Sequence, residues 1–146
     1  MTDTNRTRTY TWADPMAGAE LGATMSGMEY LQAMIAGKIP PPPIAITLDF
    51  RLAEIGEGRA VFTGTPAEYH YNPIGVVHGG LIATLLDSAL GCSIHSMLPA
   101  GTGYTTLELH VNFVRPLTAH GEATTVTESA VAADLRQALD RLGALA

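Results

Sequence analysis

Periodic apolar positions first appear near residue 26 and predict a short helix. Ser26 and Glu29 stand at the spacing of a capping box, in which each side chain satisfies a backbone donor at the start of a helix. Four apolar residues follow at helical spacing: Met28, Leu31, Met34 and Ile35. The helix must end before the prolines at 40–43, which cannot continue it and which favour an extended chain.

Alternating patterns predict three strands. Residues 44–53 and 59–66 are joined around Gly56 and Gly58, which predicts an antiparallel hairpin. The stretch YTTLELHVNFVRP predicts a third strand over 104–115, closed by a proline. One face of this strand is polar: Thr106, Glu108, His110 and Asn112. The other face is apolar and is expected to be buried: Leu107, Leu109, Val111 and Phe113.

Residues 79–97 predict a long helix that is apolar nearly all round. The stretch GLIATLLDSALGCSIHSML contains no lysine, arginine or glutamate. Such a helix is stable in water only when other parts of a protein surround it. We therefore expect an α+β fold, in which a long antiparallel sheet wraps around one buried helix.

Composition and charge limit the classes of function. The 146 residues fit one compact domain, and a hydrophobic content of 47% is typical of a globular chain. A net charge of −6, with eight Lys and Arg spread over the whole length, argues against a nucleic-acid partner. The sequence shows neither a long apolar run nor a signal-peptide pattern, so no membrane partner is expected. Cys92 is the only cysteine and can form no internal disulfide, which favours a cytoplasmic location.

Asp87 interrupts the apolar helix and needs an explanation. Most of its neighbours at helical spacing are small, which indicates that another part of the protein approaches closely: Gly80, Ala83, Thr84, Leu90 and Gly91. An ionised carboxylate in such a place must find hydrogen-bond donors, or its pKa rises. Asp87 is therefore either a structural aspartate bonded to a neighbour or a functional group, and the pattern alone leaves both open.

The start of this helix is a candidate oxyanion site. Gly79 and Gly80 leave backbone N–H groups free at the positive end of the helix dipole. Taken alone, the glycine pair is better explained by a tight turn into the helix. Together with the amide of Asn72 and the carboxylate of Asp87, it has the groups that acyl transfer to water requires.

The stretches NPIGVVHGGLIATLLDSALG and TTLELHVNFVRP resemble the hotdog-fold acyl-CoA thioesterases of the PaaI-like type. The resemblance covers residues 44–122. It implies that Asp87 attacks the thioester or activates a water, that the N–H of Gly79 stabilises the oxyanion, and that Asn72 orients the thioester or the water. It also implies that Thr106 places a hydroxyl near the carboxylate, on a strand that belongs to the partner subunit's side of the site. A homodimer or a dimer of dimers is therefore expected.

The resemblance further suggests a set of substrate-binding residues: His78, Gly80, Thr84, Gly91 and Arg115. His78 would fix the loop before the helix rather than exchange protons. Arg115 would meet a CoA phosphate, although a solvated arginine is the commoner case. No cofactor is expected other than the CoA of the substrate itself. No metal is expected either, since Cys92 and His95 have C-x-x-H spacing but no second pair of ligands.

The C-terminal tail departs from the pattern of these enzymes. Residues 130–143 predict an amphipathic helix in place of the final strands, which puts the closed sheet and the activity in doubt. The expected organisation is a flexible segment over 1–18, a hotdog domain over 19–128 and an atypical tail over 129–146.

Three functions fit the sequence. The first is hydrolysis of a small or medium acyl- or aryl-CoA, which the carboxylate on the helix favours. The second is a hotdog hydratase or dehydratase, although such enzymes usually carry an aspartate where His70 stands. The third is an acyl-CoA binder without activity, or an inactive relative.

Overall fold

The computed structural model describes residues 6–119 and 124–129. Four α-helices are found in this part of the chain: α1 (Pro15–Gly22), α2 (Gly27–Ile35), α3 (Pro43–Leu48) and α4 (Gly79–His95). Three strands accompany them: β1 (Phe50–Gly56), β2 (Arg59–Gly64) and β3 (Thr124–Ser129). A single 3₁₀ turn over Glu68–His70 lies between β2 and α4. The predicted α+β class is confirmed.

The three strands form one antiparallel sheet in the order β1-β2-β3. Leu52 of β1 pairs with Phe62 of β2, and a bulge follows Leu52 on β1. The hairpin turns at Gly58, which has a φ of 67° that glycine adopts without strain. The N–H of Gly58 donates to Oγ of Ser96 at 2.9 Å, so the hairpin is tied to the end of α4.

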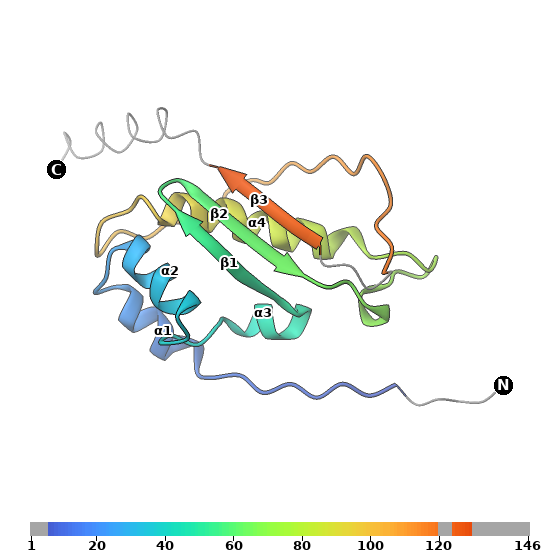
Figure 1. Ribbon diagram of the computed structural model, residues 1–146, viewed down its shortest axis with the longest axis horizontal. Coiled ribbons are helices and arrows are strands. Elements are labelled where there is room, and N and C mark those ends of the chain that lie inside the picture. The colour runs from blue at the N-terminus through green and yellow to red at the C-terminus, as the bar shows by residue number, and fades with distance from the viewer. Residues whose placement is uncertain (1–5, 120–123, 130–146) are drawn as a thin grey trace.

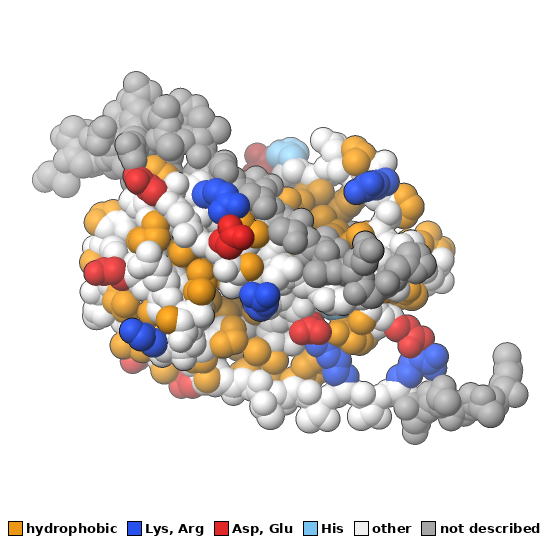
Figure 2. Space-filling model, viewed as in Figure 1, with side chains coloured by type: hydrophobic (Ala, Val, Ile, Leu, Met, Phe, Trp, Pro, Cys, Tyr) orange, Lys and Arg blue, Asp and Glu red, His pale blue; other side chains and the backbone are white. Residues whose placement is uncertain are grey.

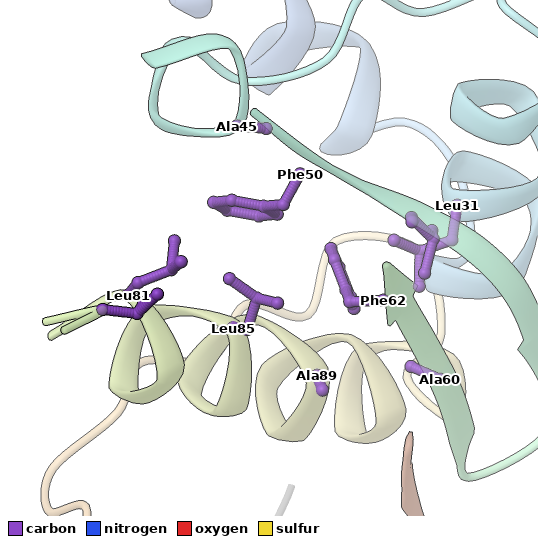
Figure 3. Close-up of a cluster of buried hydrophobic side chains, with 10 residues drawn as sticks. Leu31, Ala45, Phe50, Ala60, Phe62, Leu81, Leu85 and Ala89 are labelled. Carbon is purple, nitrogen blue, oxygen red and sulfur yellow. The ribbon is translucent and has the colours of Figure 1, made fainter. Parts of the chain in front are cut away.

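Helix α4 lies behind the sheet, and the core fills the space between them (Figures 1 and 3). Phe50 and Phe62 point from the two strands toward the helix, with ring centroids 5.9 Å apart. Leu81, Leu85 and Ala89 meet them at helical spacing from α4 and are buried. The long predicted helix at the centre of the fold is therefore confirmed.

The predicted capping box at the start of α2 is also confirmed. Oγ of Ser26 accepts from the N–H of Glu29, and the Glu29 carboxylate accepts from the N–H of Ser26 at 2.9 Å. The predicted strand at 44–53 begins too early, because residues 43–48 form α3. Pro43 occupies the first turn of α3, where its fixed φ suits a helix and its missing N–H costs nothing. Asp49 then ends the helix in the left-handed conformation, with a φ of 55°.

The predicted strand at 104–115 is not found: these residues run alongside α4 without a hydrogen-bonded strand partner in the described chain. The apolar face expected to be buried is partly open, since Leu107 is 94% exposed and Phe113 59% exposed. The position beside β2 is taken by β3 instead. Alternation is a property of the sequence, whereas a strand also needs a neighbour for its backbone groups.

Two further predictions concern the ends of the chain. Helix α1 overlaps the end of the segment that was expected to be flexible. One strand, β3, follows residue 118, where the sequence suggested that the final strands are missing. The predicted helix at 130–143 lies outside the described residues, and the division into 1–18, 19–128 and 129–146 stays a prediction.

The charged side chains of the described residues are scattered over the face in Figure 2. Several Lys and Arg side chains there stand beside acidic ones. One ion pair among the described residues joins Arg59 and Glu54 at 2.9 Å. A stripe of basic side chains, which nucleic-acid phosphates require, is not seen on this face.

A substitution at Gly27 tests how closely α2 packs against the end of α4. Its N–H donates to the carbonyl of Leu98 at 3.0 Å, and a Cβ at this position would overlap the carbonyl oxygen of His95. We expect Gly27→Ala to lower the free energy of unfolding by about 1–3 kcal/mol, although alanine is the better helix former. Gly103→Ala is the matched control, because no atom lies within 4 Å of its added Cβ. Urea denaturation of both variants measures the difference, and equal stabilities would contradict the close contact.

Candidate active site

Asp87 has a hydrogen-bond partner within its own chain. Oγ1 of Thr106 donates to Oδ1 of Asp87 at 2.8 Å. The carboxylate is half-buried on α4, and Thr106 is an exposed residue of the segment that runs beside the helix. The structure therefore brings together two of the four predicted catalytic residues, and the donor that a half-buried carboxylate requires is a hydroxyl.

The small residues around Asp87 give room to the segment 104–113. A Cβ added to Gly91 would lie 2.8 Å from the ring of Tyr104, and one added to Gly79 would lie 3.0 Å from the ring of Phe113. The segment therefore runs antiparallel to α4, with Tyr104 near the end of the helix and Phe113 near its start. Glycine permits this approach because it has no Cβ to meet the rings.

His78 is the N-cap of α4. Its Nδ1 accepts from the N–H of Gly80 at 2.8 Å, and its own N–H donates to the carbonyl of His70 at 2.8 Å. The N–H of Gly80 is therefore engaged, and that of Gly79, the first residue of the helix, is the remaining candidate oxyanion donor. Thr84 donates its hydroxyl to the carbonyl of Gly80 at 2.8 Å, so this side chain is held on its own helix.

Asn72 organises the loop that leads into α4. Its Oδ1 accepts from the N–H groups of Ile74 and Val76, at 3.1 and 3.2 Å. Two bonds to the backbone fix the orientation of the amide group. The structure thus shows a structural use for the amide oxygen, and the role in orienting a thioester or a water stays a prediction.

Gly79 and Asp87 lie too far apart to act on one carbonyl group within one chain. They are eight positions apart on α4. At a rise of about 1.5 Å per residue, this separation is about 12 Å along the helix axis. An oxyanion donor and a nucleophile or base must each lie about 3 Å from the reacting group. The sequence analysis did not reveal this distance, because it considered only the types of the groups and their order along the chain.

A pocket of about 470 Å³ lies between α2, the hairpin and α4, and Asp87 and Thr106 line it. Most of the other lining residues are apolar, including Leu31, Met34, Phe50, Leu52 and Phe62. The volume is in the range of sites for small organic ligands. Arg115, the candidate for a CoA phosphate, is exposed and outside this lining, whereas Arg51 belongs to it.

Burial shifts the pKa values of three side chains that line the pocket. It raises the pKa of Cys92 to about 12, which makes this thiol a poor nucleophile. Burial is also the main cause that raises the pKa of Tyr104 to about 12 and that lowers the pKa of His95. In the described residues, no group of three His, Cys, Asp or Glu could hold a metal ion.

The sequence analysis did not identify Tyr30, His95 and Tyr104 as parts of the site. His95 was considered only as a metal ligand with Cys92, and both residues line the pocket. Tyr104 stands two positions before Thr106, so its place at the start of the alternating stretch was a usable signal. Tyr30 gave none, because helix α2 reaches the pocket only through the tertiary fold.

Comparison with known proteins agrees with this geometry. The Thioesterase superfamily profile matches residues 74–129, which include Asp87 and Thr106. A solved structure from Ralstonia eutropha JMP134, a proposed thioesterase related to phenylacetic acid degradation, is 27% identical with a TM-score of 0.60, over 67% of this chain and 74% of that one. The fold is that of the PaaI-like hotdog thioesterases.

Two other PaaI-like or thioesterase structures support the same assignment. The PaaI protein of the E. coli phenylacetic acid degradation operon is 25% identical, with a TM-score of 0.57 and 70% of each chain covered. A thioesterase family protein from Silicibacter pomeroyi is 27% identical, with a TM-score of 0.56, over 66% of this chain and 67% of that one. The predicted resemblance to hotdog thioesterases is thereby confirmed.

A curated relative shares only part of its length with this chain. It is a proposed esterase from Halobacterium salinarum, 43% identical over 44 residues, which are 29% of each chain. Within residues 6–119 and 124–129, no helix is long and apolar enough to cross a bilayer.

His70, which precedes the loop leading into α4, is expected to make the stability of the fold depend on pH. It is buried, its Nδ1 accepts from the N–H of Ala67 at 3.0 Å, and its Nε2 lies 3.0 Å from the carbonyl oxygen of Leu48. Burial lowers its pKa from 6.5. The unfolded chain therefore binds a proton at His70 more readily than the folded protein does, so protonation favours unfolding. The contribution of His70 to the free energy of unfolding is complete above the unfolded pKa of about 6.5 and is lost as the pH falls below it.

We therefore expect the free energy of unfolding to decrease from about pH 8 to about pH 5, and to decrease less in His70→Gln. Glutamine can accept from Ala67 and donate to Leu48 without titrating. His95 contributes in the same direction in both proteins, since burial lowers its pKa as well. Urea denaturation across this range measures the two slopes. Identical slopes would show that His70 does not carry the dependence.

Proposed function

We propose that the protein hydrolyses a small or medium acyl- or aryl-CoA thioester to the free acid and CoA. The main observation behind this proposal is the hydrogen bond from Thr106 to Asp87, in a pocket that is otherwise mostly apolar. Such a pocket suits the acyl group of a thioester, and the carboxylate is the one acidic group in its lining. The similarity to PaaI and to other thioesterases supports the same reaction.

The proposed reaction uses two groups of α4, the carboxylate of Asp87 and the N–H of Gly79. Asp87 either attacks the thioester carbonyl or removes a proton from an attacking water. The N–H of Gly79, at the positive end of α4, stabilises the negative charge that develops on the carbonyl oxygen. Asn72 and His78 hold the loop that presents this N–H. If Asp87 attacks, CoA leaves as its thiolate, which takes a proton from solvent, and water then hydrolyses the acyl-aspartate anhydride to the free acid. If Asp87 activates water, the tetrahedral intermediate breaks its C–S bond, and Asp87 returns the proton to the leaving CoA thiolate.

The separation of about 12 Å along α4 requires that these groups come from two chains. Asp87 of one chain and Gly79 of the partner subunit would form one site, and the reverse pair a second site. Two-fold symmetry creates such paired sites without further requirements. The protein is therefore proposed to act as a homodimer, or as a dimer of such dimers.

The exposed segment 104–115 supports a definite pairing. Thr106 lies beside Asp87, and Phe113 lies beside Gly79. If the segment pairs antiparallel with its copy so that Thr106 faces Phe113 of the partner subunit, Asp87 comes next to Gly79 of the partner subunit. The two-fold axis then passes between residues 109 and 110. The same pairing gives a strand partner to backbone groups that have none within residues 6–119 and 124–129, and it covers Leu107.

Mixing two inactive variants tests the shared site. Asp87→Asn keeps the shape of the side chain, and Gly79→Pro removes the candidate oxyanion donor at the first helical position, where the backbone tolerates proline. The proline Cβ would also lie 3.0 Å from the ring of Phe113, so Gly79→Ala, which adds a Cβ and keeps the N–H, is the matched control. Asp87→Asn and Gly79→Pro should each lose about 10²–10³-fold in acyl-CoA hydrolysis. After joint refolding, mixed dimers carry one intact site, so activity should return to about a quarter of the wild-type value.

Release of free thiol measures the rates, and circular dichroism verifies that each variant is folded. Full activity of Asp87→Asn would exclude the carboxylate from the reaction. Two inactive variants that do not recover on mixing would place both groups in one chain and would refute the pairing. A folded wild-type protein that binds acyl-CoA but releases no thiol would be a binding protein without activity.

Thr106 is proposed to position the carboxylate. Thr106→Val keeps the branched shape and removes the hydroxyl, which should lower kcat by about tenfold or more, as expected for a lost hydrogen bond to a charged group. Thr106→Ser keeps the hydroxyl and should retain most of the activity. Steady-state kinetics on both variants provide the comparison. Equal losses in the two variants would assign the effect to packing.

A further inference from the structure

Three aromatic side chains form a cluster at the end of the pocket that is far from Asp87 along α4. His95, in the last turn of α4, lies between Tyr30 of α2 and Tyr104. The ring centroids are 5.6 Å apart for His95 and Tyr30, and 5.3 Å apart for His95 and Tyr104. We call Tyr30, His95 and Tyr104 the ring cluster.

The ring cluster separates two cavities. All three rings line the pocket of about 470 Å³ that contains Asp87. The same three rings line a second cavity of about 310 Å³ on their other side. The second cavity is completed by α1, through Ala19, Gly22 and Ala23, and by the turn at 101–103. The rings are thus the shared wall of the two spaces.

Close packing on glycines holds two of the rings in place. A Cβ on Gly22 would lie 3.1 Å from the ring of Tyr30, and one on Gly91 would lie 2.8 Å from the ring of Tyr104. Either contact leaves little room for the ring to move toward the helix that carries the glycine. The wall is therefore a built feature of the fold, supported from α1 on one side and from α4 on the other.

The space between the carboxylate and the wall is that of a short acyl group. Tyr104 packs on Gly91, four positions after Asp87 on α4, or about 6 Å along its axis. His95 is eight positions after Asp87, or about 12 Å along the axis. Between them, Ser88 and Cys92 of α4 face the apolar side chains of α2 and the hairpin. The wall itself is uncharged near neutral pH, because burial lowers the pKa of His95 and raises that of Tyr104. An apolar chain end can therefore lie against it.

We propose that the ring cluster sets the maximum length of the acyl group, which lies in the larger cavity with its carbonyl at Asp87 and its far end against Tyr30, His95 and Tyr104. This inference rests on the proposed thioester hydrolysis, and it names the residues that limit the substrate. A longer chain meets the rings and is excluded. Removal of one ring joins the two cavities and admits a longer chain toward α1.

The test compares octanoyl-CoA with tetradecanoyl-CoA. In Tyr104→Ala, the ratio of kcat/KM for the longer substrate to that for the shorter one should rise by about tenfold or more. Each added methylene that gains apolar cover contributes a factor of about four. A general loss of activity near Thr106 affects both substrates equally and cancels in the ratio. Tyr30→Ala opens the wall from the side of α2 and should act in the same direction.

Two matched variants distinguish the loss of the wall from other effects of the substitutions. Tyr104→Phe keeps the ring and should keep the wild-type ratio. Ala19→Phe fills the second cavity from the exposed surface of α1, so adding it to Tyr104→Ala should return the ratio toward the wild-type value. Thermal unfolding confirms that each variant is folded. An unchanged ratio in the folded Tyr104→Ala and Tyr30→Ala proteins overturns the proposal.

A binding experiment distinguishes this inference from the proposed function. Non-hydrolysable thioether analogues of the two substrates are titrated into wild-type protein and Tyr104→Ala by calorimetry. If no thioester is hydrolysed but the ratio of affinities shifts as predicted, the hydrolysis is wrong and the ring cluster still limits chain length. If the analogues bind with the same ratio in both proteins, or do not bind, the ring cluster does not have this role.

Discussion

The rigidity of α4 is the constraint on which the rest of the site depends. One straight helix carries the candidate oxyanion donor at Gly79 and the carboxylate at Asp87, about 12 Å apart along its axis. A helix buried against a sheet cannot bend to bring them together. Every catalytic use of both groups therefore needs a second copy of the chain, and the segment 104–115, which has no strand partner among the described residues, offers its backbone groups for that contact.

The same helix explains why a carboxylate is tolerated inside an apolar stretch. The small side chains around Asp87 leave space for the segment 104–113, and this segment supplies the hydroxyl of Thr106 as a donor. The structural and functional explanations of Asp87 are thus not alternatives. The hydrogen bond that makes the charge acceptable in the fold also fixes the direction in which the carboxylate points.

Local signals in the sequence predicted the elements whose causes are local. The capping box at Ser26, the hairpin around Gly58 and the apolar helix α4 follow from residues close together in the chain. Helix α3 was missed because a run of prolines was interpreted as extended, although Pro43 suits a first helical turn. The strand at 104–115 was predicted from alternation, and the described chain supplies no neighbour for it. The ring cluster was missed because its members come from three distant segments.

The hydrogen bond from Thr106 affects which oxygen of Asp87 can react. Oδ1 accepts the hydroxyl proton at 2.8 Å, which reduces the availability of that oxygen as a nucleophile or as a base. We infer that the reaction uses Oδ2, while Oδ1 anchors the group. A carboxylate held through one oxygen has lost most of its rotational freedom before the substrate arrives, so little further ordering is needed in the transition state. The positioning of this one group by a neighbouring hydroxyl thus serves attack on the carbonyl and activation of water equally well.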